Sequence, residues 1–294
     1  MEQFIAQLIN GLNLGSIYAL VAIGYTMVYG IIRLINFAHG EIMMFGAYFA
    51  FYIVFLFPFE LPFIVVLLIS MILAALMGIL IEKIAYKRLR KAPRISALIT
   101  AIGMSLFLQN LALLVFGAEP KVMPVLISKE PISILGIDVP TITVVTISLS
   151  IIFMVLLTVF IRQTKPGKSM RAVSQDKEAA MLMGINVNSV ISLTFAIGSA
   201  LGALGGVFYS VAFSQVYPNL GVMPGLKAFV AAVVGGIGSI GGAMVGGYTI
   251  GLVETMTKAY ISSMWSDAIV FGILIIVLLF KPSGLLGKNE KEKV

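Results

Sequence analysis

Four neighbouring residues with polar or small side chains, Asn36, His39, Gly40 and Glu41, stand between two strongly apolar stretches of the sequence. Imidazole and carboxyl groups can pass protons or gate a solute, and an ionisable residue inside a membrane marks a functional site by default. The same residues also suit the start of a helix, because Asn36 can cap it and Glu41 favours the positive end of its dipole. A transport pathway and a helix cap at the cytoplasmic interface are therefore both open interpretations.

A second break is rich in glycine and interrupts a long apolar run. It contains Gly235, Gly236, Gly238, Ser239, Gly241 and Gly242. The preceding segment 226–236 would span only about 16 Å as a helix, which is half of a bilayer. We predict a half-helix that enters from outside, a glycine turn inside the membrane and a return helix at 243–258. Irregular backbone at that depth must be buried in protein or line a cavity, so both breaks are expected to line a transport pathway. Close helix packing is the alternative.

The polar segment 162–188 contains the pattern of one short helix. Ser174 or Asp176 can cap it, Glu178 suits its first turn, and Gly184 can end it. An exposed apolar face is expected from Ala179, Ala180, Leu182 and Met183. Such a face favours a protein partner, and the alternative is a helix that lies on the lipid surface.

Membrane-spanning helices must position these groups. Of the 294 residues, 60% are hydrophobic and 11% are charged, whereas soluble proteins have roughly 45–50% and about 25%. This composition excludes a soluble enzyme, a nucleic-acid-binding protein and a disordered chain. The apolar runs approach the length of spanning helices and lack the ten-residue alternation of barrel strands. The expected fold class is all-α, a polytopic transmembrane bundle of about 8 spans that includes the broken hairpin.

The spans are expected within one transmembrane domain, residues 1–294. Besides the hairpin they are 4–30, 38–57, 62–81, 95–116, 141–161, 189–212 and 266–281. Segment 162–188 is then a cytoplasmic loop, and 117–140 is an external loop whose β-branched pieces around Gly136 can pair as a small hairpin.

Positive charge predicts the orientation. Fifteen of the twenty Lys and Arg residues fall within 83–94, 162–177 and 281–293. Because basic loops stay in the cytoplasm, these segments are assigned inside, with the N-terminus outside and the C-terminus inside. The sequence has no cysteine and a single histidine, which excludes disulfides and makes a histidine metal cluster implausible.

Several motifs resemble a known family of transport proteins. Glu178-Ala179-Ala180-x-x-x-Gly184 is similar to the EAA-x3-G signature of ABC importer membrane subunits, which docks into the ATPase. Longer motifs resemble the branched-chain amino-acid permeases; they are Arg171–Asn186, Asn36–Tyr48, Val234–Gly242 and Phe280–Gly287. The resemblance covers essentially the whole chain, and the length matches the shorter of the two permease types. The later I-x-L-P of the signature is missing, so the docking contact is carried over for Arg171–Asn186 only.

The resemblance implies an importer for leucine, isoleucine and valine in the inner or plasma membrane, and no enzymatic activity. It implies a second homologous permease subunit, two cytoplasmic ABC ATPases and an extracytoplasmic binding protein as partners. The coupling residues it implies are Arg171, Asp176, Glu178, Ala179, Ala180, Leu182 and Gly184. The chain has no G-x-x-x-x-G-K-[ST] motif, so ATP would be bound by a partner and this chain would need no cofactor. A urea or amide permease of the same family, an ion-coupled amino-acid carrier and a membrane scaffold are the alternatives.

Overall fold

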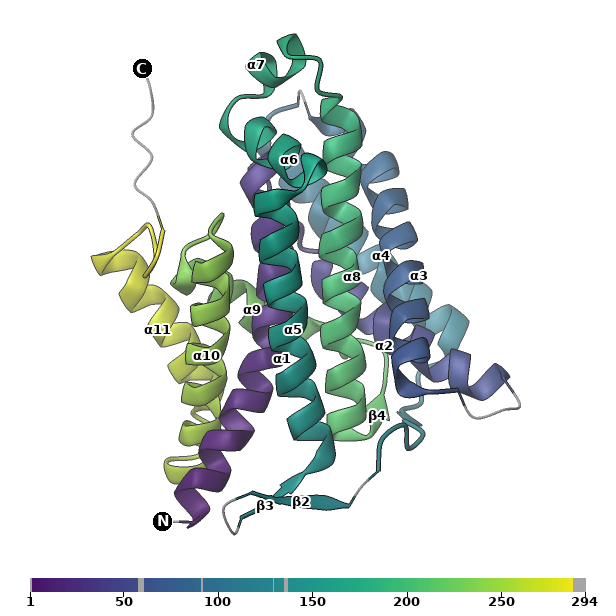
Figure 1. Cartoon of the computed structure of the whole chain (residues 1–294), viewed down its shortest axis with the longest axis vertical. Coiled ribbons are helices and arrows are strands. Elements are labelled where there is room, and N and C mark those ends of the chain that lie inside the picture. The colour runs from purple at the N-terminus through teal and green to yellow at the C-terminus, as the bar shows by residue number, and fades with distance from the viewer. Residues whose placement is uncertain (1, 58–60, 91, 129, 135–136, 288–294) are drawn as a thin grey trace.

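Helices dominate the computed structural model, which describes residues 2–57, 61–90, 92–128, 130–134 and 137–287 (Figure 1). Six helical segments in this part of the chain are long and apolar enough to span a membrane. They are α1 (Glu2–Ile32), α2 (His39–Leu56), α3 (Phe63–Ile81), α4 (Arg94–Phe116), α5 (Thr141–Gln163) and α8 (Val187–Phe213). A π-helical stretch, Glu82–Tyr86, and a 3-10 turn, Lys87–Leu89, extend α3. The predicted polytopic helical bundle is confirmed.

Five further helices complete the bundle. They are α6 (Lys165–Gln175), α7 (Lys177–Leu182), α9 (Val222–Gly235), α10 (Ile240–Tyr260) and α11 (Ser266–Phe280). The most apolar windows of α1, α2 and α8 are 89%, 72% and 72% buried, whereas that of α4 is only 17% buried. The centre of the bundle is therefore built from α1, α2 and α8. The outer helices expose large apolar side chains such as Leu114, as expected of a surface that faces lipid.

Small residues let the central helices approach closely. A methyl group placed on Gly206 in α8 would lie 1.9 Å from the carbonyl oxygen of Met43 in α2. One placed on Gly251 in α10 would lie 2.3 Å from the backbone of Gly15 in α1. No larger side chain fits at either position, and this is how helices pack in lipid without a hydrophobic driving force between them.

Short strands cover the end of the bundle that holds the N-terminus (Figure 1). Strand β2 (Pro131–Ile134) pairs antiparallel with β3 (Ile137–Pro140), which confirms the predicted hairpin around Gly136; Gly136 itself lies outside the described residues. Strand β1 (Lys121–Val122) pairs with β4 (Gln215–Val216), a contact that the sequence did not predict. This second pair fastens segment 117–140 to the end of α8.

The two ends of the bundle separate the loops as the charge pattern predicts. Helices α6 and α7 lie at the end opposite the N-terminus and the β2–β3 hairpin (Figure 1). The C-terminal segment 281–287 lies beside the α9–α10 turn, in the half of the bundle nearer to α6 and α7. Several residues used in the charge argument lie outside the described part of the chain; they are Lys91, Lys288, Lys291 and Lys293.

Helices α9 and α10 form the predicted hairpin, and α9 is the shorter arm with 14 residues against 21. The depth of its glycine turn differs from the prediction. A methyl group on Gly30 would lie 3.7 Å from the Cα atom of Gly238, and Gly30 is two residues before the end of α1. The turn therefore lies level with the end of a spanning helix and not halfway along it.

The C-terminal segment closes this turn. The backbone N–H of Leu285 donates to the carbonyl oxygen of Val234 at 2.8 Å, and that of Leu286 donates to Gly235 at 2.9 Å. The last carbonyl groups of a helix have no partner within the helix. Here the chain end supplies one, so the turn needs no membrane-embedded cavity to satisfy its backbone.

Candidate functional site

Two helices begin partway along the bundle, α2 and α9, and their starts pack against each other. A methyl group on Gly221 would lie 1.8 Å from the carbonyl oxygen of Gly40, and one on Gly225 would lie 2.7 Å from its Cα atom. Gly40 thus meets the start of α9, not the glycine turn at its end. The sequence carries a signal for the interruption before α9, because Pro218 and Pro224 flank Gly221. A loop outside the membrane explains the same residues equally well.

Asn36 orders the turn that begins α2. Its side-chain Oδ1 accepts hydrogen bonds from the backbone N–H of Ala38 at 3.1 Å and from the hydroxyl of Tyr86 at 2.8 Å. Its backbone carbonyl accepts from the N–H of His39 at 3.0 Å. Asn36 is 2% exposed. Asn36 therefore orders the turn before α2, but Ala38 holds the cap position and no side chain caps the helix, so the predicted cap by Asn36 does not form. Tyr86 ties Asn36 to the π-helical stretch after α3.

His39 is a packing residue in this structure. Its ring meets that of Tyr25 edge-on with 4.6 Å between centroids. It fills a notch left by glycines: a methyl group on Gly24 would lie 2.3 Å from its Nε2 atom, and one on Gly202 would lie 3.2 Å from its Cε1 atom. The imidazole therefore lies between α1 and α8, inside the bundle and not at the cytoplasmic interface.

Glu41 lies in a different environment, because it lines a cavity of about 180 Å³ between α2, α4 and α9. Its Oε1 atom accepts hydrogen bonds from Gln109 Nε2 at 2.8 Å and from Ser105 Oγ at 3.2 Å. The structure thus separates His39 from Glu41, although the sequence presents them as one cluster. Ser105 and Gln109 were not predicted as site residues; the available signal is two polar residues one helical turn apart within an apolar span.

The glycine turn has its own contacts and does not line this cavity. Ser239 caps α10, since its Oγ accepts from the N–H of Gly242 at 3.1 Å. A methyl group on Gly235 would lie 1.9 Å from the carbonyl oxygen of Gly242. Gly236 and Gly238 have φ angles of +113° and +93°, which residues with a side chain rarely adopt, and Gly241 has no close neighbour. These features account for packing and turn geometry; a pathway-lining role stays a prediction.

The predicted coupling helix forms as α7. The carboxylate of Asp176 accepts from the backbone N–H groups of Glu178 at 2.9 Å and Ala179 at 3.0 Å, and Gly184 ends the helix with a φ of +81°. Its apolar tip is strongly exposed: Leu182 is 89% and Met183 82% exposed.

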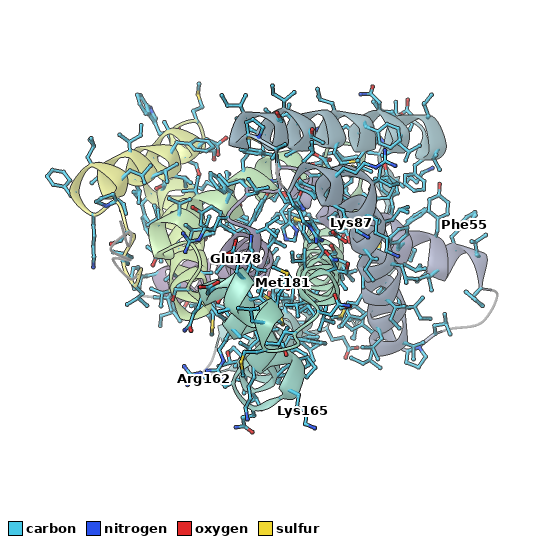
Figure 2. The ribbon with its side chains drawn as sticks, turned by 90° about the horizontal axis from the view of Figure 1, so that it is seen from above. Phe55, Lys87, Arg162, Lys165, Glu178 and Met181 are labelled. Atoms are coloured by element: carbon cyan, nitrogen blue, oxygen red, sulfur yellow. The ribbon has the colours of Figure 1, made fainter. Side chains whose placement is uncertain are left out.

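The end of the bundle that carries α7 is basic. Seen from above, Glu178 and Met181 lie near the middle of this end, with Lys87, Arg162 and Lys165 around them, while Phe55 lies at the periphery (Figure 2). Burial lowers the pKa of Lys177 at the start of α7, and the nearby positive charges of Arg90 and Arg33 lower it further. Cations from three separate segments therefore crowd the base of α7.

Two details of segment 162–188 differ from the prediction. Ala180 is only 4% exposed and faces the bundle, so it does not belong to the exposed apolar face. The segment also contains a second helix, α6, whose start is capped by Thr164 Oγ1 accepting from the N–H of Gly167 at 3.1 Å. Thr164 followed by Pro166 is a sequence signal for a helix start that the prediction overlooked. Arg171 lies on α6 and donates to the carbonyl oxygen of Arg162 at 3.3 Å.

A buried carboxylate connects α8, the helix that follows α7, to the π-helical stretch after α3. Glu82 is fully buried and accepts hydrogen bonds from Arg90 Nη2 and from Ser192 Oγ on α8, the latter at 2.7 Å. Arg90 also donates to Asn188 at the start of α8, a few residues after α7. Because Tyr86 in the same π-helical stretch bonds Asn36, that stretch links α8 to the turn before α2.

A helical bundle with a largely apolar cavity between the starts of α2 and α9, lined on one side by the carboxylate of Glu41, and with a capped apolar helix at one end, defines the class of multi-pass membrane permeases. The chain belongs to the family described as branched-chain amino acid transport system / permease component, whose model matches residues 7–279.

Three relatives illustrate the range of similarity. The chain is 43% identical to the high-affinity branched-chain amino acid transport system permease protein LivH of Salmonella typhimurium, over 99% of this chain and 98% of that protein. It is 42% identical to the corresponding protein BraD of Pseudomonas aeruginosa, with the same coverage. The ribose import permease protein RbsC of Haemophilus influenzae is 29% identical over 49% of this chain and 45% of its own length.

Proposed function

We propose that this chain is a membrane-spanning subunit of an ATP-driven importer that carries branched-chain amino acids into the cell. An extracytoplasmic binding protein would deliver the solute, and two cytoplasmic ABC ATPases and a second homologous permease subunit would complete the system. The names of the two most similar relatives above support this solute class. A urea or amide permease and an ion-coupled carrier remain as outcomes of the test below.

The observation that carries the proposal is the exposed tip of α7. Met181, Leu182 and Met183 are 54%, 89% and 82% exposed on a rigid, capped helix. Contiguous exposed apolar groups at the end of a protein, outside the lipid-facing surface, favour a docking partner. Because α7 directly precedes α8, and Ser192 of α8 bonds Glu82 in the stretch after α3, a movement of the docked ATPase would reach the bundle.

The proposal includes an orientation, with α7 in the cytoplasm and the β2–β3 end outside. Because the chain has no cysteine, single cysteines report sidedness directly. We expect Ser128→Cys to react with an impermeant maleimide added outside, and Gln175→Cys to react only after the membrane is opened. Both side chains are exposed, so access to the residue does not limit the reaction. Labelling of Ser128→Cys from the cytoplasm only would contradict the orientation.

The function itself is tested by reconstituting the chain with the proposed ATPases, second permease subunit and binding protein. We expect uptake of radiolabelled leucine into proteoliposomes to require ATP and binding protein, and to be unaffected by a protonophore. Competition by isoleucine and valine, but not by urea, is expected. Uptake that a protonophore stops and ATP does not drive would identify a secondary carrier, and competition by urea alone would identify an amide permease.

A further inference from the structure

The cavity beside Glu41 contains an unsatisfied acceptor. Glu41 is 2% exposed; its Oε1 atom is bonded by Ser105 and Gln109, but its Oε2 atom is buried without a hydrogen-bond partner. Buried polar atoms without a partner are rare in proteins and costly, above all on a carboxyl group. A ligand that donates a hydrogen bond from a positive group would satisfy this atom. The free Oε2 atom of Glu41 is therefore suited to a ligand that carries a positively charged hydrogen-bond donor.

The start of α9 lines the other side of the cavity and carries a partial positive charge. Helix α9 begins at Val222, which lines the cavity together with Gly221 and Gly225. No side chain caps the start of α9, and its first turn contains no acidic residue. The N–H of Val222 is already bonded to the carbonyl oxygen of Asn219 at 3.0 Å, and Pro224 has no N–H, so this helix start offers chiefly the partial positive charge of its dipole, which favours a carboxylate. The start of α2 differs, because Glu41 already stands in its first turn.

The remaining wall is apolar and the space is small. Phe37, Ile102, Leu106 and Leu226 line it, and its volume of about 180 Å³ is below the roughly 300–1,000 Å³ of pockets for drug-sized ligands. An aliphatic side chain of a few carbon atoms fits such a wall better than a sugar or a peptide, which would leave polar groups without partners.

We propose that this cavity binds a free α-amino acid with an aliphatic side chain, whose ammonium group bonds Glu41 and whose carboxylate faces the start of α9. This inference rests on the proposed function and assigns its solute a site within this chain. The geometry pairs both charges of the amino acid, and a neutral amide such as urea brings no charge to either end.

Protection of a cysteine at the cavity tests the site independently of transport. Val222→Cys places a thiol on the cavity wall in a chain that has no other. The probe is a small methanethiosulfonate, applied to proteoliposomes that contain the full-length chain with its co-purified partners. We expect leucine to slow the reaction, and 4-methylpentanoate and 3-methylbutylamine, which lack the ammonium and the carboxylate respectively, to protect much less.

Glu41→Gln then removes the charge while keeping the size of the side chain. In the Val222→Cys background we expect it to raise the leucine concentration for half-protection by about tenfold or more, the effect of losing a charge-assisted hydrogen bond. Glu119→Gln is the matched control, because that carboxylate is exposed in the segment before β1 and does not line the cavity. Glu41→Asp, which keeps the charge, should recover part of the protection.

The experiments distinguish a wrong binding site from a wrong transport function. If leucine is transported by the parent complex but never protects Val222→Cys, the site is wrong and the function stands. Equal protection by leucine and 4-methylpentanoate would also overturn the site, since the comparison needs no Glu41 variant and does not depend on how well one folds. If no aliphatic amino acid is transported, the proposed function fails, whatever the cysteine shows.

Discussion

Replacing Leu182 with aspartate is expected to abolish ATP-driven uptake while leaving the permease folded. The side chain is 89% exposed at the tip of α7, so the isolated chain loses almost no packing. If this tip docks into an ATPase, the substitution buries a carboxylate without a partner in an apolar contact. Such a change costs about 3 kcal/mol or more, which weakens docking on the order of 100-fold. The measurement is co-purification of the ATPase together with leucine uptake.

The burial of each side chain on α7 decides which variants can serve as controls. Leu182→Met keeps the tip apolar and should retain docking. Ala180→Asp is unsuitable because Ala180 is buried and the variant would disturb folding. Glu178→Arg and Ala179→Asp change exposed positions of the same helix and are expected to weaken docking in the same assay. If Leu182→Asp co-purifies with the ATPase and transports at the parental rate, α7 is not the coupling helix.

A second large effect is expected from Lys227→Met in α9. The Nζ atom of Lys227 lies 2.7 Å from both Glu254 on α10 and Asp267 on α11, and Glu254 is nearly fully buried. Removing one partner of a buried ion pair typically costs about 3–5 kcal/mol, because the other charge stays buried. We expect a loss near 3 kcal/mol, the low end of this range, since the hydroxyl of Tyr18 and the Nζ of Lys258 still bond Glu254.

The double variant Lys227→Met/Glu254→Gln separates the two contributions. It removes the uncompensated charge and leaves an amide that can accept from Tyr18, so most of the stability should return. Thermal unfolding of the purified permease in detergent measures both variants. Because this network fastens α9 two residues beyond Gly225, the single variant is also expected to reduce uptake. Equal stability of Lys227→Met and the parent would show that α9 is held by packing alone.

Local sequence determined the elements of this protein. The apolar runs predict the spans, and the basic segments predict which loops share an end of the bundle. Asp176 and Gly184 mark the start and end of α7 because capping and positive φ involve only residues within one helical turn. The β2–β3 hairpin around Gly136 is predictable for the same reason. The overlooked helix α6 carried its own signal in Thr164 and Pro166.

Only the tertiary structure decided which interruptions meet and which polar groups share a cavity. The sequence predicts that the break before α2 and the glycine turn both line a pathway inside the membrane, but Gly40 packs against Gly221, and the turn lies level with the end of α1. Likewise His39 and Glu41, two residues apart, face different neighbours, because successive positions on a helix point in different directions. Ser105 joins Glu41 from a separate helix. Such contacts depend on how whole helices pack, and no short-range preference of the residues encodes them.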